Sequence, residues 1–508
     1  MLVNSLGPKL GELYSSHSLS ALLNILLVGQ ASYTILWLFY TFFLSSLRKV
    51  PGPFLARLTR FWEVKKVSTG DVHNVIIDAH KQHGPIVRIA PNRYDFDTPE
   101  ATKIIYRIGN AFHKSHFYDP FGSPKFKNLL NELDNGRHAA MRRQLASLYT
   151  MSAVLSYENA VNVQTSILKK RLQDFASQGQ VVDVPQFLQY YAFDVIGVIT
   201  VGSSMGMMES NSDLHGACRE LDGIWHYSAM LGLVPSLHPW IVRLASLLRL
   251  PSVSDGLESF VDAQLRRYKE KASRSATDDM NATFIGQMLK LQEQGKATDA
   301  ETRLCLFVNI GAGSDTTAIS LSSAIYYLYT NPHTLRRLRE ELDGAAQAGK
   351  VSSPISFEQA QQMHYLQAVI KEALRLHPGV GTQLTRVVPK GGVVIEGQFF
   401  PEGVEVGVNA WALYHNQNVF GKDASEFRPE RWLEPGNENL RIAGSFAFGA
   451  GPRSCLGKNI SILEMSKAIP QIVSNFDLYL EPKDKEWENK CWWFVKPAYK
   501  ARVECRTV

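Results

Sequence analysis

The most informative stretch of this 508-residue chain reads Phe448-Gly449-Ala450-Gly451-Pro452-Arg453-Ser454-Cys455-Leu456-Gly457. The residues that follow it, 458–476, have helical periodicity, so Cys455 is expected at a helix N-terminus. Free backbone N–H groups and the positive end of the helix dipole stabilise a thiolate at that place. Gly449 and Gly451 let the backbone pass close to a flat cofactor and direct amides at the sulfur. The stretch therefore predicts a loop that presents Cys455 as a metal ligand.

The side chains around Cys455 fit an iron porphyrin, because Phe448 supplies an apolar wall and Arg453 is placed to reach a carboxylate. An axial thiolate on haem iron pushes electron density toward O–O cleavage. The alternative is an ordinary loop-to-helix turn around a buried cysteine, which needs no such specific pattern. At its defining positions the stretch resembles the haem-binding signature of the cytochrome P450 family. The resemblance implies that Cys455 ligates the iron of heme b, with Phe448, Gly449, Arg453 and Gly457 as further haem-binding residues.

Composition favours one large domain after the N-terminal region. Hydrophobic residues make up 45% of the chain and charged residues 20%, which suffices for a substantial core. The five cysteines have no CxxC spacing, so they indicate no zinc cluster and no disulfide framework, and they suit a reducing compartment. The net charge of +6 is modest, and basic and aromatic residues do not cluster as nucleic-acid binding requires. Nucleic acid is therefore not expected as a partner.

An apolar segment near the N-terminus predicts a membrane anchor. Residues 13–47 contain no Asp, Glu, Lys or Arg, and residues 19–47 are long enough to span a bilayer with some tilt. A cleaved signal peptide would have a shorter apolar core and a small-residue cleavage site. Basic residues are frequent within 48–66, whereas Lys9 alone precedes the segment, so the positive-inside rule places the body in the cytoplasm. The alternative is a buried helix of a soluble protein.

Proline chemistry sets the end of this segment, because Pro51-Gly52-Pro53 stops a helix. The resulting organisation is a short N-terminal segment (1–18), a transmembrane anchor (19–47), a basic and proline-rich hinge (48–60) and a haem-thiolate catalytic domain (61–508). In the body, 86–90 and 93–97 predict a hairpin, 99–376 is overwhelmingly helical, and 392–395, 404–408 and 493–503 predict strands. Periodicity alone indicates a helix-rich α+β protein. The resemblance implies the P450 fold, mainly α with a minor β portion, preceded by one transmembrane helix.

A second motif, Ala312-Gly313-Ser314-Asp315-Thr316-Thr317, lies inside a helical run from about 298 to 330. The threonine hydroxyls can bond back to carbonyls four residues earlier, which bends a helix and opens a small groove. Taken alone, such a run is usually a cap or a polar helix face. It also matches the oxygen-activation motif of the P450 family, and the match implies that Asp315 and Thr316 relay protons while Ala312 lies against the haem.

A third motif is Glu372-Ala-Leu-Arg375, whose charged residues share one helix face in apolar surroundings. This arrangement favours a buried network over a surface pair, which would contribute little. The later segment Phe427-Arg428-Pro-Glu-Arg431-Trp432 offers a second arginine. In the P450 family such a triad braces the haem loop. Arg428 and Arg431 both remain candidates, and Arg431 fits the usual position of the motif better.

Basic residues elsewhere predict contacts to the haem propionates. His138 and Arg142 are four residues apart, so they share a helical face from which both can donate to an anion. Many P450s have tryptophan where this chain has His138, and the alternative for this face is a solvent-facing basic turn. Arg386, in an extended segment, resembles another propionate contact.

By analogy with the family, five segments are expected to line a site for a hydrophobic small molecule: 112–121, 225–234, 309–312, 379–383 and 491–495. The whole chain resembles fungal microsomal P450s of specialised metabolism, including the pisatin-demethylase-like group. The resemblance implies a monomeric, single-pass enzyme of the endoplasmic reticulum membrane. It would insert one oxygen atom from O2 with electrons from an NADPH-dependent flavoprotein reductase.

A basic face that includes Arg142, Arg143 and Lys458 would suit docking of an acidic reductase. Two other functions are open. The first is a reductase-independent haem-thiolate isomerase or dehydratase, which would not need the proton relay of Asp315 and Thr316. The second is a haem-binding membrane protein that acts as a sensor or carrier, for which the sequence offers no positive sign.

Overall fold

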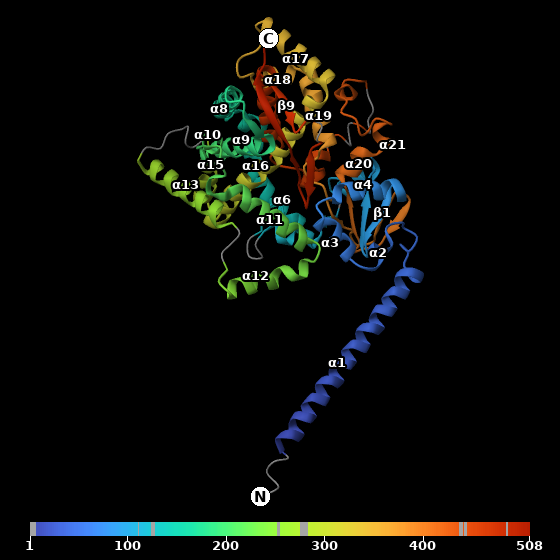
Figure 1. Ribbon diagram of the computed structural model, residues 1–508. Coiled ribbons are helices and arrows are strands. Elements are labelled where there is room, and N and C mark those ends of the chain that lie inside the picture. The colour runs from blue at the N-terminus through green and yellow to red at the C-terminus, as the bar shows by residue number, and fades with distance from the viewer. Residues whose placement is uncertain are drawn as a thin grey trace.

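The computed structural model describes residues 7–109, 111–122, 127–250, 254–274, 283–435, 440, 444, 446–483 and 486–507. Most of these residues lie in helices, and the strands form small sheets, as the helix-rich α+β prediction required. Figure 1 shows a helical body from which one long helix, α1, extends. The prediction of a mainly α fold with a minor β portion is confirmed.

The N-terminal helix α1 (Gly7–Phe39) is followed by a π-helical turn, η1 (Tyr40–Leu44). Within the described residues two helices are long and apolar enough to cross a membrane, Asn24–Leu44 and α16 (Asp299–Thr330). A bent pair, Ala217–Gly232 with Pro235–Leu247, would count as a third if it formed one span. Only 6% of the Asn24–Leu44 window is buried in the protein, against 61% for α16. The first therefore has the exposure of an anchor and the second that of a core helix.

The proline-rich hinge is fixed to the body. Arg57, in the short helix α2 (Phe54–Leu58), donates hydrogen bonds of 3.1 Å to the carbonyl oxygens of Arg48 and Val50. The backbone N–H of Arg88 donates to the carbonyl of Pro51 at 2.8 Å. The hinge is thus folded on itself through Arg57, and it is joined to the body through the bond between Arg88 and Pro51.

The largest sheet has the strand order β1-β2-β8-β5-β3. β1 (Ile86–Ala90) and β2 (Arg93–Phe96) form the predicted antiparallel hairpin, and β2 pairs in parallel with β8 (Glu405–Val408). β5 (Arg386–Val387) pairs antiparallel with both β8 and β3 (His113–Lys114). This register places Lys114 opposite Arg386, although 272 residues separate them in sequence.

The other sheets are smaller. β6 (Val393–Ile395) pairs with β7 (Gln398–Phe400), β10 (Glu488–Cys491) pairs with β11 (Val495–Ala498), and β12 (Lys500–Cys505) lies between β4 (Val181–Asp183) and β9 (Phe476–Glu481). The single strand predicted over 493–503 is therefore two strands that belong to different sheets.

The core is built around α16, which begins with a capping box between Thr298 and Glu301 and runs as one uninterrupted helix. It packs against α9 (Val184–Val201), α19 (His364–Leu376) and α23 (Lys458–Asn475). A Cβ at Gly313 would lie 2.8 Å from the Ile196 side chain of α9. The glycine that weakens the helix locally thus permits close packing of two helices.

The remaining helices surround this core (Figure 1). They are α3 (Phe61–Ser68), α4 (Val72–His83), α5 (Pro99–Ile105), α6 (Asn135–Leu145), α7 (Met151–Leu155), α8 (Glu158–Ser177), α10 (Met207–Ser210), α11 (Ala217–Gly232), α12 (His238–Leu247), α13 (Asp255–Arg274), α15 (Phe284–Glu293), α17 (Pro332–Gln347), α18 (Phe357–Gln362), α20 (Ala410–His415) and α21 (Gln417–Phe420). Short 3-10 turns that matter for the site are η2 (His116–Phe121), η6 (Pro429–Trp432), η7 (Phe446–Phe448) and η8 (Gly451–Arg453).

Candidate active site

The loop that carries Cys455 closes on itself. The backbone N–H of Cys455 donates to the carbonyl of Phe448 at 2.7 Å, and α23 begins three residues later with Gly457 as its N-cap. Gly449 and Gly451 have φ values of 70° and 66°, a region that favours glycine. A Cβ at Gly451 would overlap the carbonyl oxygen of Tyr106. The backbone of Tyr106 therefore excludes a side chain at position 451, whether or not a cofactor is bound.

The Cys455 side chain is accessible, while the protein around it raises the pKa of its thiol by desolvation. Backbone N–H groups of Gly457 and Lys458 and the charges of Arg142 and Lys458 lower this pKa. The pKa of Cys455 stays above its ordinary value, and the amides at the start of α23 offset only part of the effect of burial. A thiolate is the form of cysteine that binds a metal.

Arg142 lies on the same side as the sulfur. Its Nη1 donates to the carbonyl of Ser454 at 2.7 Å, so it holds the residue that precedes Cys455. Lys458 lies over the ring of Phe448, with Nζ 5.6 Å from the ring centroid. These contacts give Arg142 a place at the cysteine loop, whereas the sequence predicted a contact to a propionate.

A cluster of cations lies elsewhere in the site and consists of Lys114, His138, Arg386 and Arg453. Burial and then the charges of Arg386 and Arg453 hold the pKa of Lys114 well below its ordinary value. Burial and then the charge of Arg453 lower the pKa of His138 to about 3, and burial and then Arg386 lower that of Arg453 to about 10. These four basic side chains are therefore close enough for the charges of the arginines to disfavour protonation of Lys114 and His138.

The hydrogen-bond acceptors of this cation cluster are mostly neutral. Lys114 Nζ donates to the carbonyl of Leu130, and Arg386 Nη1 donates to that of Thr385 at 3.0 Å. Arg453 donates to main-chain carbonyls and to the side-chain oxygen of Asn135 at 2.8 Å. Buried cations need an anion or a strong acceptor. The two propionates of haem carry the charge that this donor set lacks, so the residues fit the group.

Lys114 is the member that sequence analysis missed. It was not singled out because its relation to Arg386 depends on the pairing of β3 with β5, which are far apart in the chain. The only local signal was that this lysine lies within 112–121, a segment predicted to line the substrate site.

The oxygen-activation motif lies on α16. Thr316 is half-buried, and its hydroxyl donates to the carbonyl of Ala312 at 2.8 Å, the predicted bond to the preceding turn. Asp315 is 1% exposed and accepts hydrogen bonds from Trp225 Nε1 at 2.6 Å and from the Gln189 side-chain amide. Lys496 Nζ lies 3.2 Å from the same carboxylate. The two motif residues are neighbours in sequence but contact different surroundings.

The predicted charge network is formed and buried. Arg375 binds Glu372 through two hydrogen bonds of 2.9 and 2.8 Å, and Arg431 Nε donates to Glu372 Oε1 at 2.9 Å. Trp432 Nε1 donates to the other carboxylate oxygen at 2.8 Å. The Arg428 side chain turns instead to Asp423 and Glu434, and only its backbone N–H reaches Glu372. Arg431 is thus the arginine that completes the triad.

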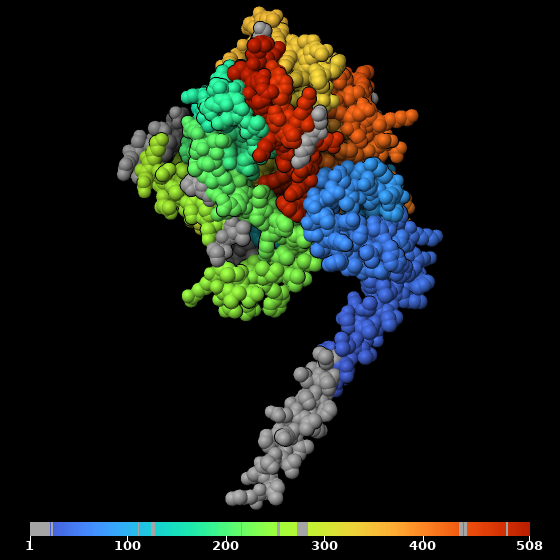
Figure 2. All heavy atoms as spheres, in the orientation of Figure 1, coloured from blue at the N-terminus to red at the C-terminus, as the bar shows by residue number. Residues whose placement is uncertain are grey.

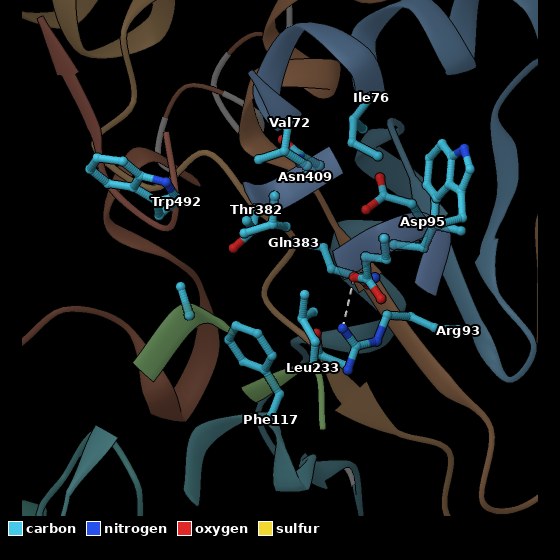
Figure 3. A pocket seen from close by; sticks show the side chains of 16 residues that line it. Val72, Ile76, Arg93, Asp95, Phe117, Leu233, Thr382, Gln383, Asn409 and Trp492 are labelled. Carbon is cyan, nitrogen blue, oxygen red and sulfur yellow. Dashed lines mark hydrogen bonds and ion pairs between the residues drawn. The ribbon is translucent and has the colours of Figure 1, made fainter. Parts of the chain in front are cut away.

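A narrow pocket lies between α3, α4, the first sheet, η2 and α11 (Figure 3). Four of the five segments predicted to line a substrate site contribute to it, among them Phe117, Leu233, Gln383 and Trp492. Apolar side chains form most of its wall, and the ion pair of Arg93 with Glu63 (2.8 Å) lies at one side. Residues 309–312 do not line this pocket.

A cysteine loop at a helix N-terminus, a cation cluster and a buried Glu-Arg-Arg triad define a haem-thiolate protein. The family model for cytochrome P450 matches residues 51–505, and the chain belongs to this family. It is 60% and 59% identical over 509 residues to two proteins named pisatin demethylase from Fusarium vanettenii, covering all of this chain and 100% and 98% of those proteins. It is 34% identical to cytochrome P450 monooxygenase cicH of Emericella nidulans, over 91% of this chain and 94% of that one. The chain is thus a cytochrome P450 monooxygenase.

Proposed function

We propose that this P450 is a membrane-anchored monooxygenase that demethylates pisatin or a close structural analogue. The observation that carries the proposal is the 60% identity to a pisatin demethylase, which extends over the full length of both chains. Aromatic and aliphatic side chains in the segments expected to line the substrate site, such as Phe117 and Leu233, support an uncharged, lipophilic substrate. The expected site segments supply aromatic side chains, including Phe117 and Trp492, against which an aromatic molecule can stack.

In this proposal Cys455 ligates the iron, and Lys114, His138, Arg386 and Arg453 bind the propionates. Phe448, Gly449, Gly457 and Ala312 flank the cofactor. The Glu372–Arg375–Arg431 network braces the cysteine loop from the proximal side. When bound, the haem supplies the activation of O2 and the oxidation of an unactivated C–H bond.

The protein supplies the groups that transfer protons. Thr316 offers a half-buried hydroxyl on α16, and Asp315 offers a carboxylate one residue earlier. Hydroxylation of an O-methyl carbon gives a hemiacetal, which collapses to the free hydroxyl compound and formaldehyde. The balance is one O2, one NADPH and one proton consumed per methyl group, with one water and one formaldehyde released.

Two further elements belong to the proposal. Electrons come from an NADPH-dependent flavoprotein reductase, which docks on the basic face near Arg142, Arg143 and Lys458. The enzyme is a single-pass protein of the endoplasmic reticulum with its body in the cytoplasm. Figures 1 and 2 show α12 on the side of the body toward which α1 extends, and α12 exposes Trp240, Leu244 and Leu247 there. These side chains support contact of this side with lipid.

The test is turnover by microsomes that contain the chain and a NADPH–P450 reductase, with pisatin as the probe. We expect formaldehyde and demethylated product in equal amounts, and only with NADPH. A rearranged or dehydrated product formed without NADPH and without formaldehyde would favour the isomerase or dehydratase alternative. A normal ferrous–CO spectrum with no formaldehyde would refute the demethylase proposal.

A further inference from the structure

The side chain of Trp225, in α11, contacts a carboxylate through its N–H and aromatic side chains through its ring. Its indole N–H donates to Asp315 Oδ2 at 2.6 Å. Its ring makes a T-shaped contact with Phe494, with centroids 5.0 Å apart, and lies 5.8 Å from the ring of Trp493. One side chain thus contacts both the carboxylate of the oxygen-activation motif and a group of aromatic rings.

These rings form an aromatic wall, defined here as Phe121, Trp225, Trp493 and Phe494. Phe121 and Trp493 are 4.3 Å apart between centroids, and Trp493 and Phe494 are 4.7 Å apart. All four residues lie within segments expected to line the substrate site. An aromatic ligand that packs against this wall contacts rings whose preferred geometries are specific.

The carboxylate of Asp315 is bound from three separate elements. Gln189 comes from α9, Trp225 from α11 and Lys496 from β11. Lys496 also pairs with Asp222, which lies one helical turn before Trp225 on the same face of α11. A displacement of α11 therefore changes two of the contacts around Asp315, one of them directly.

α11 is in turn attached to the segment that carries Phe121. The Ser228 hydroxyl donates to the carbonyl of Pro120 at 2.8 Å. A Cβ at Gly232 would lie 2.6 Å from the carbonyl oxygen of Phe117, so α11 and η2 pack backbone to backbone. Packed elements of this kind move together, because their contact does not deform continuously.

We propose that Trp225 is a positioning residue that couples occupation of the aromatic wall by an uncharged aromatic molecule to the placement of Asp315. The inference rests on the proposed function of this site. Its physical basis is the angular dependence of the hydrogen bond, which weakens steeply when the indole tilts. A ligand that fixes the ring therefore fixes the carboxylate beside Thr316, and proton delivery becomes dependent on a bound substrate.

The test uses Trp225→Phe, which keeps an aromatic ring and removes the N–H. Trp411→Phe is the matched comparison, because Trp411 of α20 is buried and its indole N–H donates to the carbonyl of Pro378 at 2.9 Å. This change also removes one indole hydrogen bond, but none to Asp315. With pisatin as the probe, the Kd from the haem difference spectrum of W225F should stay within about threefold of wild type, since the ring is retained. The ratio of formaldehyde formed to NADPH consumed should fall about threefold or more, because a positioned acid contributes strongly to proton transfer. In W411F this ratio should stay at the wild-type value.

A double-mutant cycle with Asp315→Ala separates coupling from general damage. The unfolding constants of the two single variants and the double variant should be non-additive by about fivefold or more, as for residues in direct contact. If D315A does not retain haem, Asp315→Asn replaces it, with Trp225→Phe and the unfolding measurement unchanged. An additive cycle, or equal loss of the formaldehyde-to-NADPH ratio in W225F and W411F, would overturn the inference. A non-additive cycle with no formaldehyde from the wild-type enzyme would instead refute the proposed function alone.

Discussion

Arg431 Nε lies 2.9 Å from Glu372 Oε1, a contact that joins two residues 59 positions apart. Glu372 and Arg375 are fully buried, and the side chain of Arg431 is 1% exposed. Arg431 also donates to the carbonyls of Phe420 and Asp423 at 3.0 Å, so it connects α19 to the segment after α20. Breaking such a pair leaves a charge buried without its partner.

We therefore expect Arg431→Met to lower the free energy of unfolding by about 3–5 kcal/mol, the usual cost of removing one partner of a buried pair. Urea unfolding followed by far-UV circular dichroism measures it. Arg428→Met is the control, because its side-chain pairs with Asp423 and Glu434 are more exposed and should contribute less than about 1 kcal/mol. Equal losses in the two variants would contradict the assignment of Arg431 to the triad.

Cys455→Ala should abolish the thiolate-type ferrous–CO spectrum, since alanine has no sulfur to ligate iron. Cys505→Ala is the control, because this cysteine is exposed at the end of β12 and far in sequence from the loop. A thiolate-type spectrum in Cys455→Ala would show that another residue binds the iron.

Thr316→Ala should keep the ferrous–CO spectrum and lower the product formed per NADPH by about fivefold or more, because a hydroxyl of the proton relay is lost. Oxygen-electrode and NADPH measurements on the same samples give this ratio. Thr330→Ala makes the same change near the end of α16, where the hydroxyl also donates to a carbonyl four residues earlier at 2.8 Å. A matching decrease in both variants would indicate damage to the helix rather than a lost relay.

Lys114→Met should accelerate haem loss. The lysine is buried beside two arginines, so its charge is stabilised chiefly when an anion is bound among them. We expect the rate of haem transfer to apomyoglobin to rise by about tenfold, since a hydrogen bond to a charged group contributes about 1.5–3 kcal/mol. Lys103→Met, at an exposed position of α5, should leave the rate unchanged. A wild-type rate in the Lys114 variant would remove it from the propionate site.

His377 predicts a pH dependence of stability. It is fully buried, and burial lowers its pKa to about 3 from an ordinary value of 6.5. Between these values the unfolded chain binds a proton that the folded chain does not, so stability falls as the pH drops from 6.5 toward 3. Each such group contributes a slope of up to about 1.4 kcal/mol per pH unit.

His377→Gln should flatten this slope by up to that amount, because glutamine keeps an N–H donor for the carbonyl of Val495 and does not titrate. Unfolding in urea at pH 6, 5 and 4 measures the slope, with exposed His364→Gln as the control. An unchanged slope in the His377 variant would show that this histidine is protonated in the folded protein.

The sequence was sufficient where function depends on residues close together in the chain. The hairpin at 86–97, the helix from about 298 to 330, the cysteine loop and the pair of Glu372 with Arg375 follow from local spacing. Long-range pairing was not accessible in this way. Lys114 reaches the cation cluster only through the β3–β5 register, and the donors to Asp315 come from three distant elements.

The glycines of the cysteine loop also show that sequence analysis does not identify contacts between distant parts of the chain. Positive φ at Gly449 and Gly451 agrees with a turn-forming role that sequence indicates. The backbone of Tyr106, which excludes a side chain at 451, lies 345 residues earlier and has no local signature. Arg142 likewise contacts the carbonyl of Ser454, a partner that helical periodicity alone does not identify.

Hydrogen bonds hold residues 48–51 in place. They run from Arg57 to the carbonyls of Arg48 and Val50, and from Arg88 to that of Pro51. A connection held in this way passes the direction of α1 on to the body, whereas a flexible linker would not. An α-helix turns by about 100° per residue. Residues inserted into α1 would therefore rotate the remote end of this helix about its axis and leave the contacts of Arg57 and Arg88 as they are. The direction in which the chain leaves the body is thus set by these few contacts.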